Sequence, residues 1–202
     1  LQNREYSLHD RLVNVLSASA EIQYALDEED TEEIKAIAQE LSHPEIIAER
    51  VESLKKALPE KPLENTENML LYLEHLDFIG DILPQQIKDA SRFVKKLSAP
   101  LKAQTSGEYE KLAVYFVYRY FLKTVRDFDL LSKIKAMIVF VFAAEVINLS
   151  REQDAHARFE TVKELCKEIE YSDDNMDRIY DDSYLSDIFS DTSMLALLEW
   201  TL

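Results

Sequence analysis

Hydrophobic residues recur at three- and four-residue spacing along most of this chain, and this periodicity is the pattern of amphipathic helices. Leu8, Leu12, Val15 and Leu26 belong to the first stripe, and Ser7 stands before it as a candidate N-cap. Later stripes predict helices over residues 31–41, 44–58, 66–79, 84–97, 151–171, 172–181 and 192–202.

Two segments are hydrophobic on nearly every face. Residues 108–125 include the run LAVYFVYRYFL, and residues 129–150 include the apolar run Ala136–Ala144. A helix that is apolar all round is buried, and this run is far shorter than the roughly 20 residues that cross a bilayer. The pattern therefore predicts an all-α multi-helix bundle of about eight or nine helices around these two central helices.

The clearest interruption of the helical pattern is the segment 59–65, which contains Pro59 and Pro62. Proline does not fit inside a regular helix because it lacks an amide hydrogen and clashes with the preceding turn. We expect one helical domain over residues 1–202, which this proline-rich linker divides into two possible subdomains, 1–58 and 66–202.

Composition narrows the classes of function. The chain has only two glycines in 202 residues, so phosphate-binding loops and dinucleotide-binding turns, which depend on glycine, are poor candidates. Its one cysteine, Cys166, and four scattered histidines provide no cluster of metal ligands. We therefore expect no metal site in this chain, and we expect Cys166 to be a buried, inert thiol.

The net charge of −16 argues against a nucleic-acid partner. Residues 83–150 are net basic, whereas the segments on either side are strongly acidic. Acidic helices could bind a basic protein, or they could simply form solvated faces. We expect a cytoplasmic protein, and the sequence leaves its oligomeric state open.

Three stretches resemble one family. They are residues 11–16 (RLVNVL) with 21–23 (EIQ), residues 118–121 (YRYF) with 129–135 (DLLSKIK), and residues 167–175 (KEIEYSDDN). In order and spacing they resemble the C-terminal region of the bacterial flagellin lysine-N-methylases, the FliB-like proteins.

The resemblance implies a protein that methylates lysine ε-amines of flagellin with S-adenosylmethionine. The family's N-terminal part carries a C-x-x-C-x-x-C-C cluster that binds a metal or an iron–sulfur centre. This chain lacks that cluster, so we expect it to be a fragment of a longer protein and to be inactive alone. Its late motif also departs from the usual R-E-I-E-H-S-x-E-N at Lys167 and Tyr171.

Arg119 and Tyr118 are candidate ligand-binding residues. A guanidinium within an aromatic helix needs an anionic partner if it is buried. Arg119 is therefore either a clamp for a carboxylate, such as that of a methyl donor, or one half of a structural ion pair with Glu145, Glu168 or Glu170. Together with its neighbouring tyrosines, Tyr118 either lines a pocket for a methylammonium group by cation–π contact or belongs to the core.

Glu170 and Glu168 are the candidate catalytic residues. A carboxylate can orient a lysine amine and assist loss of its proton, and the alternative is a surface acid or a partner of Arg119. Residues two apart cannot share a helix face, so we expect one of the two to point inward and the other to be solvated. Ser172 and Asn175 match the family pattern as candidate binding residues, although helix capping alone would explain them.

Two hypotheses follow. In the first, the chain is the C-terminal region of a lysine N-methylase, serves substrate recognition and active-site closure, and has a polar-lined cavity near Arg119 and Glu170. In the second, it is a non-catalytic acidic helical module that binds a basic protein, with an acidic-rimmed groove and no buried charge. A homo-oligomerising structural domain is a weaker third possibility.

Overall fold

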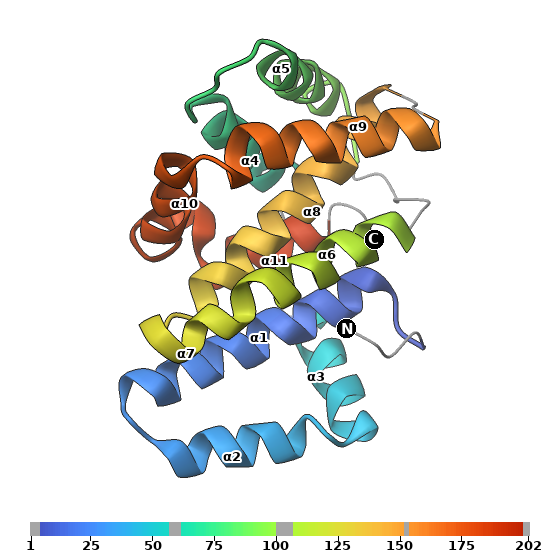
Figure 1. Cartoon of the computed structure of the whole chain (residues 1–202). Helices are drawn as coiled ribbons and strands as arrows, with labels where there is room; N and C mark the ends of the chain where they lie inside the picture. The colour runs from blue at the N-terminus through green and yellow to red at the C-terminus, as the bar shows by residue number, and fades with distance from the viewer. Residues whose placement is uncertain (1–4, 57–61, 100–106, 152–153, 200–202) are drawn as a thin grey trace.

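The computed structural model describes residues 5–56, 62–99, 107–151 and 154–199. These residues form helices, turns and bends and contain no strand, which confirms the prediction of an all-α bundle (Figure 1). The α-helices are α1 (Leu8–Asp27), α2 (Thr31–Glu40), α3 (Pro44–Lys56), α4 (Pro62–Glu74), α5 (Ile82–Val94), α6 (Gly107–Tyr120), α7 (Thr124–Asp127), α8 (Leu131–Arg151), α9 (Ala155–Leu165), α10 (Asp173–Leu185) and α11 (Asp191–Glu199).

The core is organised around α8. Every residue from Leu131 to Asn148 is buried, because α8 packs against α1, α5, α6, α9, α10 and α11. Figure 1 shows α8 running through the middle of the bundle. Burial on all sides explains why this segment needs no polar face. Its charged residues find partners at its ends and flanks, where Lys133 Nζ lies 2.9 Å from Asp127 Oδ2.

The second predicted central helix is shorter and more exposed than its sequence indicated. The helix α6 ends at Tyr120, and a 3₁₀ turn η1 (Phe121–Lys123) leads into the single turn of α7. Tyr118 and Leu122 are exposed, so the expectation that residues 112–122 are buried on most faces is wrong for the second half of the run. The first half, including Leu112 and Phe116, packs into the core, and Tyr120 is the residue of the second half that does so.

The proline-rich segment also differs from its predicted form. Pro62 begins α4, so residues 62–65 are helical rather than linking, because proline suits the first turn of a helix, where its missing amide hydrogen costs nothing. Residues 59–61 lie outside the described part of the chain. The division into two subdomains stays a prediction.

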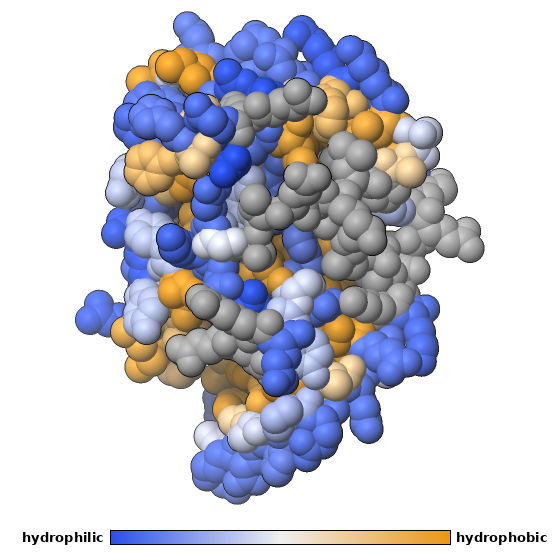
Figure 2. Space-filling view, turned by 90° about the vertical axis from the view of Figure 1, so that its right-hand side faces the viewer, coloured by the Kyte–Doolittle hydropathy of each residue, from blue (hydrophilic) through white to orange (hydrophobic). Residues whose placement is uncertain are grey.

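The α2–α3 end of the molecule has the least core. Only Ile37 of α2 is buried, and α2 and α3 both pack against α1. In Figure 2 the lower end of the visible face, where these helices lie, is mostly hydrophilic. Among the described helices, none combines the length and hydrophobicity that a bilayer span requires.

Candidate functional site

The late sequence motif, residues 167–175, lies where α9 turns into α10. After Leu165 the helix widens into a π-helical turn, η2 (Cys166–Glu170). Ser172 then caps α10, its hydroxyl accepting a hydrogen bond from the Asn175 amide at 3.3 Å. Its candidate role as a cap thus has a direct structural basis.

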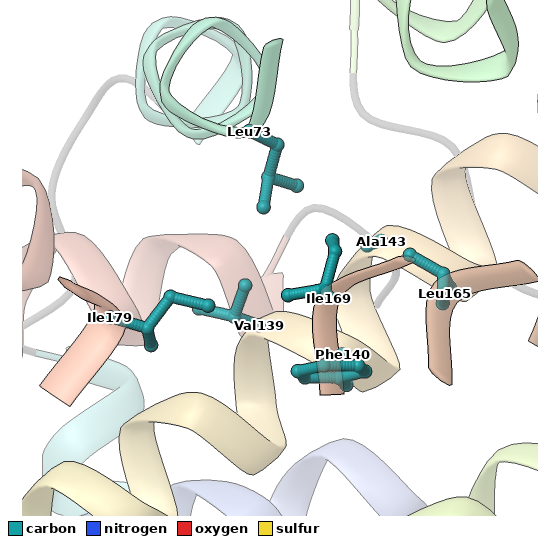
Figure 3. Close-up of a pocket in the computed structure, with 7 residues that line it drawn as sticks. All are labelled: Leu73, Val139, Phe140, Ala143, Leu165, Ile169 and Ile179. Atoms are coloured by element: carbon teal, nitrogen blue, oxygen red, sulfur yellow. The ribbon is translucent and has the colours of Figure 1, made fainter. Parts of the chain in front are cut away.

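The inner face of this turn is fixed by apolar packing. In Figure 3, Leu165 and Ile169 lie with Val139, Phe140 and Ala143 of α8, and Leu73 and Ile179 complete the cluster. The gap between these side chains is too small to admit water. The turn is therefore held rigidly against the central helix, and the directions of Glu168 and Glu170 are set by that packing.

Glu168 holds the loop between α4 and α5. Its Oε2 accepts hydrogen bonds from the amides of Ile79 at 2.8 Å and Gly80 at 3.1 Å, and its Oε1 lies 2.9 Å from Lys167 Nζ. The Lys167 ammonium, followed by the Gly80 amide, lowers the pKa of Glu168 below its usual value. A buried, ionised carboxylate bonded in this way is a structural anchor.

Asn175 anchors the same loop from α10. Its side-chain amide donates to the carbonyl oxygens of Asp77 at 2.6 Å and Glu168 at 3.0 Å, and its Oδ1 accepts from the Asp77 amide at 3.0 Å. These three hydrogen bonds of its side chain all go to main-chain groups. The geometry gives Asn175 a positioning role within the fold.

Glu170 faces the opposite way, toward α6. Its Oε1 accepts hydrogen bonds from the hydroxyls of Tyr115 at 2.6 Å and Tyr120 at 2.8 Å, and lies 2.9 Å from Arg119 Nε. Burial, the main cause, and the Glu170 carboxylate both raise the pKa of Tyr120, to about 12. Of the three carboxylates considered for Arg119, Glu170 is the partner, while Glu145 pairs instead with His9 of α1 at 3.0 Å.

The expectation that one of the two motif glutamates would be solvated is wrong. Glu168 is 2% and Glu170 4% exposed. Residues two apart do point in different directions, but here both directions are covered by protein, the α4–α5 loop on one side and α6 on the other. The π-helical turn also departs from the α-helical spacing on which the expectation was based.

Arg119 sits among three aromatic rings. Its guanidinium carbon lies 5.9, 5.6 and 5.6 Å from the ring centroids of Tyr115, Tyr120 and Tyr171, which is within cation–π range. The aromatic surroundings considered for a methylammonium group thus hold the protein's own cation. Tyr118, 75% exposed, is not brought to this cluster. Tyr171 is a member that sequence reasoning missed, although its place beside Glu170 in the motif was a usable signal.

A groove of about 850 Å³ runs between α6 and α9 beside this cluster. Tyr115, Cys166 and Tyr171 belong both to its lining and to the surroundings of Arg119 and Glu170. The other lining residues are Glu108, Tyr109, Lys111, Leu112, Asn148, Ala155, Arg158, Phe159, Val162, Lys163 and Lys167.

The groove matches neither form of cavity expected from the sequence. It lies near Arg119 and Glu170, as the first hypothesis expected, but its walls are mainly apolar rather than polar. The acidic rim and the absence of buried charge expected for the second hypothesis are also wrong, because the protein buries carboxylates and most of the charged residues that line the groove are basic, the full set being Glu108, Lys111, Arg158, Lys163 and Lys167.

One comparison decides the family. The family model described as the FliB lysine N-methylase C-terminal domain matches residues 1–197. The chain belongs to that family. No curated protein and no solved structure matches the sequence.

Membership of the FliB C-terminal family makes the described region part of a lysine N-methylase, and the side chains can be tested against the cofactors expected for such an enzyme. The described residues contain no group of three or more metal-ligating side chains. Burial, followed by the Glu170 carboxylate, raises the pKa of the Cys166 thiol to about 12, so the thiolate that would bind iron is disfavoured. This part of the chain does not fit an iron–sulfur cluster.

The carboxylate clamp considered for Arg119 stays a prediction, and one group of its guanidinium is already engaged within the protein. Its Nε already serves the buried Glu170 carboxylate and the Tyr120 hydroxyl. A second carboxylate at this position would have to approach the negative charge of Glu170 within the same cluster. The arrangement holds α6 and η2 together, and no chemical step follows from it.

Proposed function

We propose that this FliB C-terminal domain recognises the lysine-bearing protein substrate, with flagellin as the expected one, and closes over it, while methyl transfer uses residues outside the described part of the chain. The observation that carries the proposal is the engagement of both motif glutamates. Glu168 is bonded to main-chain amides and Lys167. Glu170 is buried, and its Oε1 is bonded to two tyrosine hydroxyls and Arg119, while its Oε2 has no hydrogen-bond partner among the described residues. A general base must instead reach the substrate amine.

The groove between α6 and α9 supports a role in recognition. Its volume lies within the range of about 300–1,000 Å³ typical of ligand pockets, and exposed aromatic side chains of Phe159 and Tyr171 stand along it. An open, apolar groove with lysines at its rim suits an extended or helical peptide segment better than a small charged molecule. In this proposal S-adenosylmethionine and the metal or iron–sulfur centre bind elsewhere in the full-length enzyme.

Binding and activity can be separated experimentally with the 202-residue chain. We expect monomeric flagellin to bind the chain in isothermal titration calorimetry and Phe159→Ser to weaken that binding at least tenfold. The matched control is Tyr24→Ser, since Tyr24 is similarly exposed but lies on α1 outside the groove. Equal affinities for the two variants, or absence of binding, would contradict the proposal.

Activity provides the second arm of the test. We expect no transfer of a methyl group from S-adenosylmethionine to flagellin by this chain alone, measured by mass spectrometry of flagellin lysines. Turnover would show that the catalytic groups lie within the chain, and it would overturn the assignment of the domain to recognition.

A further inference from the structure

The corner where α6 passes through η1 into α7 exposes an apolar stripe. Tyr118, Phe121, Leu122 and Val125 are 75%, 46%, 69% and 76% exposed. They come from the end of α6, the 3₁₀ turn η1 and α7, and their shared exposure places apolar side chains on the outside of the corner. Figure 1 shows this corner at one edge of the molecule, where α7 ends. Clustered exposed apolar side chains of this size mark interaction sites.

A basic stripe runs beside the apolar one. Arg119, Lys123 and Arg126 follow the spacing i, i+4 and i+7 along the same corner. Lys123 stacks over the Tyr120 ring at 4.7 Å, and no carboxylate among the described residues forms an ion pair with Lys123 or Arg126. Arg119 is paired with Glu170, so Lys123 and Arg126 are the cations that make this corner locally basic in a chain of net charge −16. We call the two stripes together the 118–126 surface.

We propose that the 118–126 surface docks an amphipathic helix that carries acidic residues beside its apolar face. The apolar stripe supplies the anchors for helix-on-helix packing, and the basic stripe supplies charge complementarity, which favours an acidic helix and disfavours a basic one. That the helix comes from the protein substrate rests on the proposed function above.

The surroundings favour a protein helix over an anionic membrane. Asp127 and Asp129 flank the surface on the chain, and the Tyr184 hydroxyl donates to Asp129 Oδ1 at 2.7 Å, which places α10 with its many aspartates beside the same corner. A broad anionic bilayer would meet these acids as well as the three cations, whereas a single helix would meet only the stripe.

The position of the surface links it to the groove. Tyr115, which lines the groove, lies one helical turn before Tyr118, about 5 Å along α6. A helix seated on the 118–126 surface would therefore direct its neighbouring chain segment toward the α6–α9 groove. Docking and recognition would then act on one substrate in succession along α6.

The test uses two synthetic helical peptides that share one leucine stripe and differ in flanking residues, glutamate in one and lysine in the other. We expect the acidic peptide to bind the 202-residue chain in fluorescence anisotropy at least tenfold more tightly than the basic one. Leu122→Ser combined with Val125→Ser should abolish that binding, while Leu71→Ser, at an exposed site on α4, should leave it unchanged. Lys123→Glu with Arg126→Glu should reverse the preference to the basic peptide.

Failure to bind either peptide, or binding that ignores the two double variants, would overturn the proposal. The proposal would also be overturned if neither peptide binds but the chain binds phosphatidylglycerol vesicles, and the variant with both Leu122→Ser and Val125→Ser loses that vesicle binding. All substituted side chains are exposed, and circular dichroism melts of each variant verify that it folds. If flagellin binding depends on Phe159 but not on Leu122 and Val125, this inference fails and the proposed function stands. If the acidic peptide binds here but flagellin binds nowhere, the proposed function fails.

Discussion

At the scale of single residues, Arg119 and Glu170 form an unequal pair. The glutamate is buried, whereas the side chain of Arg119 is 45% exposed. The cost of burying the carboxylate is therefore offset as much by the hydroxyls of Tyr115 and Tyr120 as by the guanidinium. The interaction is structural, and Arg119 covers the solvent-facing side of the Glu170 carboxylate.

This inequality predicts a modest effect of Arg119→Met. We expect the free energy of unfolding to fall by about 1–2 kcal/mol, because Glu170 keeps two charge-assisted hydrogen bonds, rather than by the roughly 3–5 kcal/mol typical of breaking a fully buried pair. Urea denaturation measures the difference. Arg126→Met, on the exposed basic stripe, is the control and should change little. A loss near 4 kcal/mol would mean that the tyrosines contribute almost nothing.

The Cys166 thiol gives a second prediction at this scale. Because the pKa in the folded state is raised to about 12, the thiol stays protonated at pH 8.5. We expect alkylation by iodoacetamide at this pH to be at least tenfold slower in the native chain than in urea. Mass spectrometry of the labelled chain follows the reaction, and equal rates would contradict the raised pKa.

The raised pKa of Cys166 also makes the stability of the folded chain depend on pH. A folded-state pKa above the unfolded value favours the protonated thiol, so its contribution is complete below the unfolded pKa near 9 and is lost as pH rises toward 12. Wild type should therefore lose more stability between pH 8 and pH 11 than Cys166→Ala does, since the variant lacks this group. Urea midpoints at the two pH values measure the difference. Parallel curves would show that the thiol is not linked to folding.

At the scale of elements, the short π-helical turn determines how three parts of the chain meet. Glu168 and Asn175 fasten the Asp77–Gly80 loop, and Glu170 fastens α6. The close approach of Glu168 to the loop requires a small residue at position 80, because a Cβ there would lie 2.9 Å from Glu168 Oε1. A glycine lets the carboxylate reach the loop amides.

Removing the anchor should loosen this loop selectively. We expect Glu168→Ala to cost about 2–3 kcal/mol, because hydrogen bonds to a charged group are worth about 1.5–3 kcal/mol, and to accelerate amide exchange at Ile79 and Gly80 before other sites. Hydrogen exchange by NMR resolves the individual amides. The control Glu160→Ala removes an exposed acid of α9 whose ion pair in the described part of the chain is an i, i+3 contact with Lys163. Uniform acceleration across the chain would contradict a local role.

The helices themselves were predictable, whereas their irregular joints were not. Periodicity located α1, α5 and α8, because amphipathic or wholly apolar stretches leave a direct trace in the sequence. Periodicity failed at the end of α6, because an apolar run has the same sequence pattern whether the protein core or an outside partner covers it. The burial of both Glu168 and Glu170 also escaped it, since that depends on a π-helical turn and on a loop some 90 residues earlier in the chain.

At the scale of the whole molecule, the excess of acidic side chains opposes the compact folded state. With 39 acidic and 23 basic side chains, the folded state carries net self-repulsion. We expect stability in urea to increase when sodium chloride is raised from about 10 to 200 mM, as the screening length falls from roughly 30 Å to below 10 Å. Midpoints of urea denaturation measure the effect. A steady decrease with salt would mean that ion pairs outweigh the repulsion.

The central position of α8 has a consequence for how the chain acquires its fold during synthesis. Its apolar surface is covered by α1, made long before it, and by α10 and α11, made after it. The earlier helices α1, α5 and α6 can therefore cover only part of this surface, and the rest stays exposed until α9, α10 and α11 have been made. Nascent chains halted before α10 should therefore leave part of α8 exposed and be captured by chaperones that bind exposed apolar segments.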